Sequence, residues 1–472
     1  LAVFQISGKG LKVAIRNPES ETTVAILKEL EKNSYTYDLY LVSASSLEHA
    51  WSYYKKIPKE HEMGAGTILV YQEKIRTLQK EITNLEEIKD RVEKSFHGRT
   101  TEALEIILAG ALATDASDIH IEPQQERVRL RFRLDGVLHD VSFLPKNLYS
   151  LLLSRIKLIS ELKLNVRDKG QDGRFTIQTQ AGDTEVRTST LPGPEGESIV
   201  LRVLNPKSIN LPFEGLGLHP LVIKTMEDEL RKPNGMILTT GPTGSGKTTV
   251  LYAFLRKIHS SKIKIITLED PIEYHLEGVE QTQVDAERGY DFTNGLRAIV
   301  RQDPDVILVG EIRDFETAET AMNAALTGHL VFSTLHTNNA AGAIPRLINL
   351  GVKPASIAPA LNIAMAQRLV RKLCETCRKD VKIKEAEKKR IDTELSSFPK
   401  NIFLPPAKSW MIFRAAEKGC PVCNHTGYKG RTGVFEIILI NTEVERLVLR
   451  SPSEYELQKE AARQGQLTMR QD

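Results

Sequence analysis

Apolar side chains recur every three or four residues along one stretch near residue 80, on a background rich in charged residues. Their positions are Ile75, Leu78, Ile82, Leu85, Ile88 and Val92. This spacing places them on one face of a helix, so it predicts one long amphipathic helix over residues 71–98. We interpret this helix as a linker between domains; a helix that pairs with a coiled-coil partner is the alternative.

The chain before this helix has the pattern of a small α/β unit. Residues 11–15 and 37–42 are strand-like, whereas residues 24–30 and 45–55 follow helical spacing. We predict a separate α/β domain over residues 1–70. Because the sequence does not begin with Met, we expect that N-terminal residues are missing.

Strict alternation of charged and apolar residues marks the next region. Residues 128–134 place their apolar side chains on one face, and Asp135-Gly136 supplies a hairpin turn. This pattern predicts a sheet-rich α+β domain over residues 99–210. Residues 211–218 are interpreted as a linker.

Strands and helices alternate beyond this linker, which is typical of a doubly wound, mostly parallel sheet. The predicted α/β domain covers residues 219–472 and includes a polar, cysteine-containing subdomain over residues 371–435.

Composition narrows the class of protein. The 472 residues are 41% hydrophobic and 26% charged, an ordinary globular balance, and their number favours more than one domain. The net charge is +3 and no strongly basic block stands out, which weakens the case for a nucleic-acid partner. No apolar run reaches the roughly 18 residues of a membrane-spanning helix, and no signal peptide is visible.

A phosphate-binding loop begins the α/β domain. The strand-like residues 236–240 are followed by the spacing G-x-x-x-x-G-K-[ST] and then by a helix. The glycines let backbone N–H groups face an anion, Lys247 brings a charge to the β- and γ-phosphates, and Thr248 offers a hydroxyl to Mg²⁺. The predicted loop is Gly241, Pro242, Thr243, Gly244, Ser245, Gly246, Lys247, Thr248 and Thr249. We therefore expect the chain to bind a nucleoside triphosphate with Mg²⁺.

Two further strand-like runs end in carboxylates. Residues 263–268 lead into Glu269, and residues 305–310 lead into Glu311. Acidic side chains at such strand ends face the crevice where ligands bind, so both are candidate catalytic residues. Glu311 would orient or deprotonate the attacking water, or bind Mg²⁺ through water. A later strand would deliver His336 towards the γ-phosphate, and we expect this histidine to sense that group; a structural or merely exposed histidine is the alternative.

The cysteines form two C-x-x-C pairs in an otherwise cysteine-free chain: Cys374, Cys377, Cys420 and Cys423. Four thiolates complete a tetrahedral Zn²⁺ shell with no open position, which is the structural type of zinc site. Four reduced cysteines without a metal are the alternative.

These residues resemble a known family. Residues 269–274 look like its Asp box, residues 296–305 running into 309–314 like its Walker B region, and residues 327–338 like its His box. The family is the secretion ATPases, hexameric motors of type II secretion and type IV pilus assembly. The resemblance is close over residues 100–440, and it implies a RecA-like ATPase domain that uses ATP and yields ADP.

The resemblance implies roles for particular residues. Glu311 would be the catalytic acid/base residue, and the α+β domain would pack over a neighbour's ATP site. Arg187 and Arg202 match the family's nucleotide-contacting arginines, which stabilise charge on the γ-phosphoryl group; ordinary surface salt bridges are the alternative. Residues 11–71 loosely resemble the family's N-terminal docking domain. The tetracysteine element is typical of assembly or secretion motors, whereas retraction motors lack it.

The same resemblance implies partners and a location. We expect a homohexamer at the cytoplasmic face of the bacterial inner membrane, attached through an inner-membrane platform protein and a cytoplasmic-face assembly protein. A RecA-like nucleic-acid translocase or helicase is the alternative function. Near-zero net charge and the lack of a basic, aromatic groove count against it. A scaffold that does not hydrolyse ATP is disfavoured, because Lys247, Thr248 and Glu311 are all present.

Overall fold

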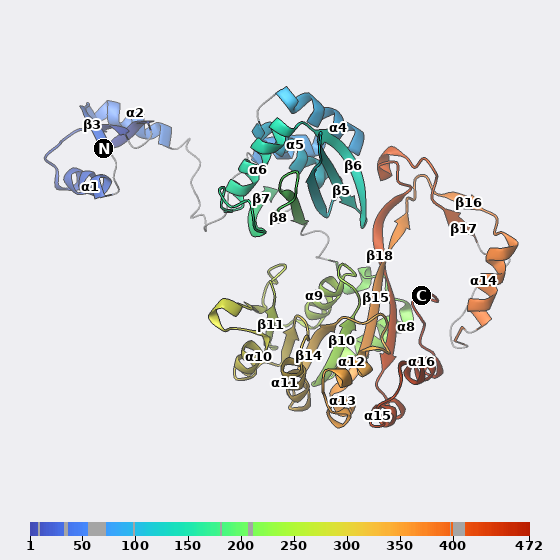
Figure 1. The fold of residues 1–472 in the computed structure, drawn as a ribbon. Coiled ribbons are helices and arrows are strands. Elements are labelled where there is room, and N and C mark those ends of the chain that lie inside the picture. The colour runs from blue at the N-terminus through green and yellow to red at the C-terminus, as the bar shows by residue number, and fades with distance from the viewer. Residues whose placement is uncertain are drawn as a thin grey trace. The chain divides into compact units, whose positions relative to one another are not determined.

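Figure 1 shows a computed structural model of the chain. It describes residues 1–7, 10–32, 36–54, 72–97, 100–179, 182–205, 211–396, 398–399 and 411–472. The chain divides into two units, residues 1–65 and residues 66–472, and each is described by itself.

The first unit contains a three-stranded sheet in the order β1-β2-β3 with two helices. Its elements are β1 (Ala2–Ser7), β2 (Gly10–Ile15), α1 (Glu21–Lys32), β3 (Thr36–Leu41) and α2 (Ala44–Tyr54). The strands β2 and β3 and both helices were expected from the sequence. Strand β1, antiparallel to β2, was not.

The prediction of one long helix over residues 71–98 is wrong. The described part forms two helices, α3 (Gln72–Glu81) and α4 (Leu85–Lys94), followed by the 3₁₀ turn η1 (Ser95–His97). Asn84 starts the second helix, since its side chain accepts a hydrogen bond from the Glu87 backbone N–H, and the Glu87 carboxylate reaches back to the Thr83 N–H. The apolar faces of both helices are buried in the core of the following α+β domain, so they do not form an exposed linker.

This α+β domain has a six-stranded antiparallel sheet in the order β6-β5-β4-β9-β8-β7. Its strands are β4 (Asp118–Pro123), β5 (Val128–Leu134), β6 (Val137–Leu144), β7 (Gln171–Thr179), β8 (Gly182–Leu191) and β9 (Ser198–Leu204). Helices α5 (Thr100–Ala113) and α6 (Lys146–Ile159) complete the domain. The apolar side chains that alternate along residues 128–134 are buried on one face of the strand, as expected.

A seven-stranded sheet forms the core of the rest of the unit, in the order β12-β11-β13-β14-β10-β15-β18. Its strands are β10 (Gly235–Thr240), β11 (Ile265–Glu269), β12 (Glu280–Gln283), β13 (Val306–Val309), β14 (Leu330–Leu335), β15 (Leu361–Leu373) and β18 (Tyr428–Leu439). All neighbours are parallel except β18, which is antiparallel to β15. The predicted doubly wound, mostly parallel sheet is confirmed.

Helices cover both faces of this sheet (Figure 1). One apolar core joins it to α8 (Pro220–Leu230) and α9 (Lys247–Ile258). The opposite core contains α10 (Phe292–Val300), α11 (Phe315–Leu326), α12 (Ala343–Asn349), α13 (Pro354–Ala360), α15 (Thr442–Val448) and α16 (Glu454–Arg463). Short 3₁₀ turns are η2 (Phe213–Gly215) and η3 (Ala286–Arg288). Phe213 and Leu216, in the linker predicted over residues 211–218, are buried in the first of these cores.

The cysteine-containing segment lies between β15 and β18. It contains β16 (Lys379–Val381), α14 (Glu385–Ser396), β17 (Ile412–Arg414) and η5 (Pro421–Cys423), and β16 pairs with β17 in a separate two-stranded sheet. The long strands β15 and β18 connect this segment directly to the large sheet.

Candidate nucleotide and metal sites

The phosphate loop lies where the sequence places it, between the end of β10 and the start of α9. Gly246 precedes the helix with φ of +89°, a conformation that side chains disfavour. A side chain at Gly241 would come within 2.7 Å of the Gln367 carbonyl oxygen on the neighbouring strand. Gly246 is therefore needed for its positive φ, and Gly241 is needed for the close approach of two backbone segments.

Lys247 begins α9 and turns back over the loop. Its Nζ donates to the carbonyl oxygens of Gly241, at 2.8 Å, and Pro242, at 3.2 Å. Burial lowers the pKa of the Lys247 amine, and the nearby Glu311 carboxylate opposes that shift. The amine is thus held among oxygen acceptors at the loop, in position to compensate an anion there.

Gln367 supports the loop from β15. Its Nε2 donates to the Ser245 carbonyl oxygen at 2.7 Å, and its side chain is almost fully buried. Holding this carbonyl fixes the peptide plane that precedes Gly246. No local pattern predicts this contact, because 122 positions separate the two residues.

Glu311 follows β13 and is brought together with His336, which follows β14. The Nε2 atom of His336 lies 3.4 Å from the Glu311 Oε2 atom. Arg313 also contacts the Glu311 carboxylate and lies 3.8 Å from Asp270. The hydrogen bond to Glu311 raises the pKa of Arg313. The carboxylate therefore has cationic or titratable groups on two sides, at the strand edge that carries the phosphate loop.

Glu269 has a different environment from the one expected. It ends β11, but its side chain is buried and does not face an open crevice. Its Oε2 accepts a hydrogen bond from the Tyr252 hydroxyl at 2.5 Å, and its Oε1 accepts from Thr267 at 2.6 Å and from Gln281 at 3.1 Å. Four residues of the site were not predicted from the sequence: Tyr252, Gln281, Gln367 and Arg313.

Arg187 and Arg202 lie directly opposite each other on the neighbouring strands β8 and β9. Nη2 of Arg187 donates to the Ile272 carbonyl oxygen at 2.7 Å, and its Nη1 lies 3.2 Å from the Glu273 carboxylate. Arg202, with 58% of its side chain exposed, lies 3.0 Å from Asp118. Both arginines therefore form ion pairs within this chain, and Arg187 is the more buried of the two arginines.

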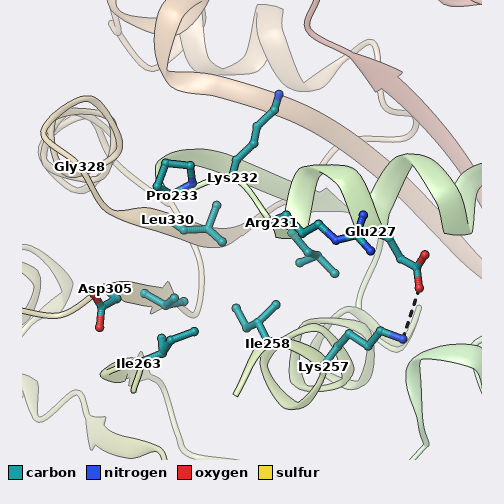
Figure 2. A pocket seen from close by; sticks show the side chains of 12 residues that line it. Glu227, Arg231, Lys232, Pro233, Lys257, Ile258, Ile263, Asp305, Gly328 and Leu330 are labelled. Carbon is teal, nitrogen blue, oxygen red and sulfur yellow. Dashed lines mark ion pairs between the residues drawn. The ribbon is translucent and has the colours of Figure 1, made fainter. Parts of the chain in front are cut away.

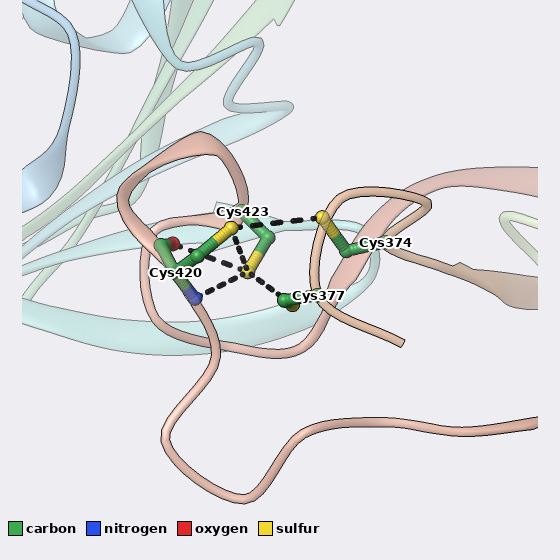
Figure 3. Close-up of side chains that lie close together, drawn as sticks. All are labelled: Cys374, Cys377, Cys420 and Cys423. Atoms are coloured by element: carbon green, nitrogen blue, oxygen red, sulfur yellow. Dashed lines mark hydrogen bonds between the residues drawn. The ribbon is translucent and has the colours of Figure 1, made fainter. Parts of the chain in front are cut away.

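The four cysteines converge where β15 ends and β18 begins, and their Sγ atoms all lie within 4.8 Å of one another (Figure 3). The Sγ–Sγ distances are 3.8 Å for Cys374–Cys420, 3.8 Å for Cys377–Cys423 and 3.7 Å for Cys420–Cys423. A Zn²⁺ ion at about 2.3 Å from each sulfur needs tetrahedral sulfurs about 3.8 Å apart. The arrangement fits zinc.

The backbone also favours the thiolate form of Cys423. The N–H groups of Cys420 and Gly427 both donate to Cys423 Sγ at 3.2 Å. Burial opposes ionisation of the Cys423 thiol, but these N–H groups and the neighbouring thiols outweigh it and lower its pKa to about 6. A thiolate is the form that binds metal.

A separate cavity of about 540 Å³ lies at the opposite, amino edge of the parallel sheet (Figure 2). It is bordered by the ends of α8 and α9 and the starts of β13 and β14. Lys257 on its wall pairs with Glu227 at 3.4 Å. None of the predicted site residues lines this cavity, so it is distinct from the phosphate loop.

The sequence matches the family model described as type II/IV secretion system protein over residues 93–472. The chain belongs to this family. The resemblance described above is thereby confirmed, and the chain is an ATP-hydrolysing secretion or pilus motor ATPase.

Two relatives show the range of the family. Type II secretion system protein E of Pseudomonas aeruginosa is 42% identical over 379 residues, which cover 80% of this chain and 73% of that protein. Type IV pilus assembly ATPase PilB of Myxococcus xanthus is 36% identical over 466 residues, which cover 98% of this chain and 79% of that protein.

The fold is also similar to a solved structure, the Legionella pneumophila ATPase DotB. The TM-score is 0.52 at 22% identity, over 78% of this chain and 89% of DotB. Among the described residues, no helix has both the length and the apolar character needed to cross a membrane.

Proposed function

We propose that this chain is the subunit of a homohexameric ATPase that powers type IV pilus assembly or type II protein secretion through an inner-membrane platform protein. The observation that carries the proposal is the meeting of Glu311 and His336 at the strand edge that bears the phosphate loop. The names of the relatives support both machines, since one is a secretion protein and the other a pilus assembly ATPase.

The phosphate loop binds the nucleotide in this proposal. The backbone N–H groups of residues 243–249 surround the phosphates, and Lys247 leaves its carbonyl partners to pair with the β- and γ-phosphates. Thr248, in the first turn of α9, offers its hydroxyl to Mg²⁺. When bound, Mg²⁺ neutralises charge on the phosphate oxygens.

Glu311 is assigned as the general base that takes a proton from the attacking water. His336 and Arg313 fix the direction of its carboxylate. His336 senses the γ-phosphate, because it contacts the base at the edge where that group binds. The Glu269 carboxylate already accepts three hydrogen bonds, so we assign it to holding the Asp box rather than to proton transfer.

Arg187 and Arg202 are assigned to the nucleotide of a neighbouring subunit. Their opposite positions on β8 and β9 let both side chains serve one site. To reach a neighbour's γ-phosphate they exchange ion pairs within their own chain for a doubly or triply charged group. This exchange would couple nucleotide binding to movement of the α+β domain.

The tetracysteine element is assigned to structural Zn²⁺, which favours an assembly or secretion motor over a retraction motor. The motor would act at the cytoplasmic face of the inner membrane, attached through the platform protein and a cytoplasmic-face assembly protein that docks on residues 1–70. We expect no nucleic-acid partner.

A strain carrying Lys247→Ala at the native locus tests the machine. We expect it to lose surface pili or secretion of exoproteins while the protein level stays normal, and the trait that is lost identifies the machine. Retention of both traits, when the purified variant no longer releases phosphate from ATP, would contradict the proposal. Stimulation of wild-type turnover by DNA would favour the translocase instead.

A further inference from the structure

A buried hydrogen bond joins the helix of the phosphate loop to the strand of the Asp box. Tyr252 lies on α9, five positions after Lys247, and its hydroxyl donates to the Glu269 carboxylate at 2.5 Å. Both side chains are buried, Tyr252 completely and Glu269 almost completely. A phenol that donates to a buried carboxylate makes a strong, directional bond.

The Glu269 charge has no cationic partner in the part of the chain that the structure describes. Three neutral donors compensate it: the hydroxyls of Tyr252 and Thr267 and the amide of Gln281. Thr267 shares the strand with Glu269, so only Tyr252 and Gln281 tie it to other elements. Removing one donor from a buried carboxylate costs more than losing an ordinary hydrogen bond.

The Tyr252 hydroxyl keeps its proton and remains the donor. Burial, together with the adjacent Glu269 carboxylate, raises the pKa of Tyr252 far above neutral pH. The direction of the bond, from α9 to β11, is therefore fixed across physiological pH.

The two ends of this bond carry groups of the nucleotide site. Thr248 and Tyr252 are four positions apart on α9 and lie on one face of the helix. At the other end, Asp270 follows Glu269 and lies 3.8 Å from Arg313, which contacts the Glu311 carboxylate. Rotation of α9 relative to β11 would therefore displace Thr248 from the groups around Glu311.

We propose that Tyr252 is a positioning residue for ATP hydrolysis, which fixes the phosphate-loop helix against the Asp-box strand through its hydrogen bond to Glu269. This inference rests on the proposed roles of Lys247, Thr248 and Glu311. Tyr252 touches no reacting atom; it acts through the carboxylate.

Tyr252→Phe keeps the ring and removes only the donor. We expect kcat to fall about tenfold, equivalent to ~1.4 kcal/mol, with the Kd for ADP within about twofold of wild type. Tyr149→Phe is the matched control, because Tyr149 is also a buried phenol with one hydrogen bond, to the Glu197 carbonyl oxygen at 2.6 Å. It should lower Tm comparably and leave kcat unchanged.

The double variant Tyr252→Phe/Glu269→Gln separates positioning from a general loss of stability. Since Tyr252 acts through Glu269, kcat of the double variant should be close to that of the slower single variant. Independent, multiplicative effects on kcat would overturn the inference. A wild-type kcat for Tyr252→Phe, with only a lower Tm, would overturn it as well.

Gln281→Leu provides a second test in case Tyr252→Phe does not fold. Gln281 lies on the edge strand β12 and is less buried than Tyr252, so its substitution should disturb folding less. It should lower kcat about threefold, and an unchanged kcat would contradict the inference. Wild type and Lys247→Ala are assayed alongside. If wild type does not hydrolyse ATP, the proposed function fails; if it does and the tyrosine variant matches it, only this inference fails.

Discussion

Two loop regions at strand ends of the same seven-stranded sheet are held in shape by different means. The phosphate loop follows β10, in which every residue is buried, and Gln367 holds its backbone from β15. In the described part of residues 374–427, the buried side chains are only Cys374, Ala416 and Cys423. The phosphate loop is therefore held in shape by the buried sheet, whereas a metal bound by the four cysteines would supply folding energy to the tetracysteine element.

The largest effect should come from the phosphate loop. Lys247→Ala removes the charge on the β- and γ-phosphates, so ATP turnover should fall at least about a thousandfold, below detection in a phosphate-release assay. The variant loses the hydrogen bonds from Lys247 Nζ to two loop carbonyl oxygens, but Gln367 still holds the loop, so Tm should stay within about 2 °C of wild type. Normal turnover in the folded variant would refute the assignment of the loop.

Removing the metal should lower the stability of the tetracysteine element and leave nucleotide binding intact. Wild-type protein should contain about one Zn²⁺ per chain by elemental analysis, and Cys374→Ser should contain almost none. Hydrogen exchange should then increase first in residues 371–435, because metal binding there supplies folding energy. Binding of ADP should survive, since the loop lies on the buried sheet. Metal-free wild-type protein with full stability would contradict the zinc assignment.

The two arginines test whether the nucleotide site is completed by a second subunit. Arg187→Ala and Arg202→Ala should each lower turnover at least about tenfold while ATP still binds. Mixing either variant with Lys247→Ala subunits should restore part of the activity, because each mixed pair of subunits can supply one intact loop and one intact arginine. No recovery in confirmed mixed assemblies would count against action between subunits.

The smallest effect concerns the support of the loop. Gln367→Met keeps the buried volume but removes the donor to the Ser245 carbonyl. We expect the Kd for ADP to rise about fivefold at most, as one hydrogen bond to a neutral acceptor contributes about 1 kcal/mol. Gln171→Met, at a glutamine of the α+β domain that bonds to Lys163 and Val166, is the control and should leave the Kd unchanged.

The features predicted correctly from the sequence are local. The strand, loop and helix around Lys247 are predicted by a pattern of about a dozen residues, and the spacing of the paired cysteines predicts a metal site. The contacts of Tyr252 with Glu269 and of Gln367 with Ser245 join distant segments, so no spacing rule reveals them. The sequence does contain a signal for the break in the helix at Asn84, since an N-cap residue followed three positions later by Glu87 is typical of a helix start. The continuous apolar spacing favoured one long helix instead.

Expectation and structure differ most at Glu269. A carboxylate at the end of a parallel strand is often a ligand group, and this position was expected to be catalytic for that reason. Its side chain instead lies beneath α9, because Tyr252 from the helix and Gln281 from the edge strand supply donors there. A strand end fixes the position of a residue, but neighbouring elements decide which way its side chain points.

Glu311→Gln tests the central claim, that this chain hydrolyses ATP at the phosphate loop with Glu311 as the base, most directly. The substitution keeps the shape of the side chain and removes its ability to take a proton. Purified variant and wild type are given ATP, and bound nucleotide and released phosphate are measured over time. The variant should retain intact ATP, with a Kd within about threefold of wild type and kcat lowered at least about a hundredfold. Wild-type kcat in the variant would contradict the account.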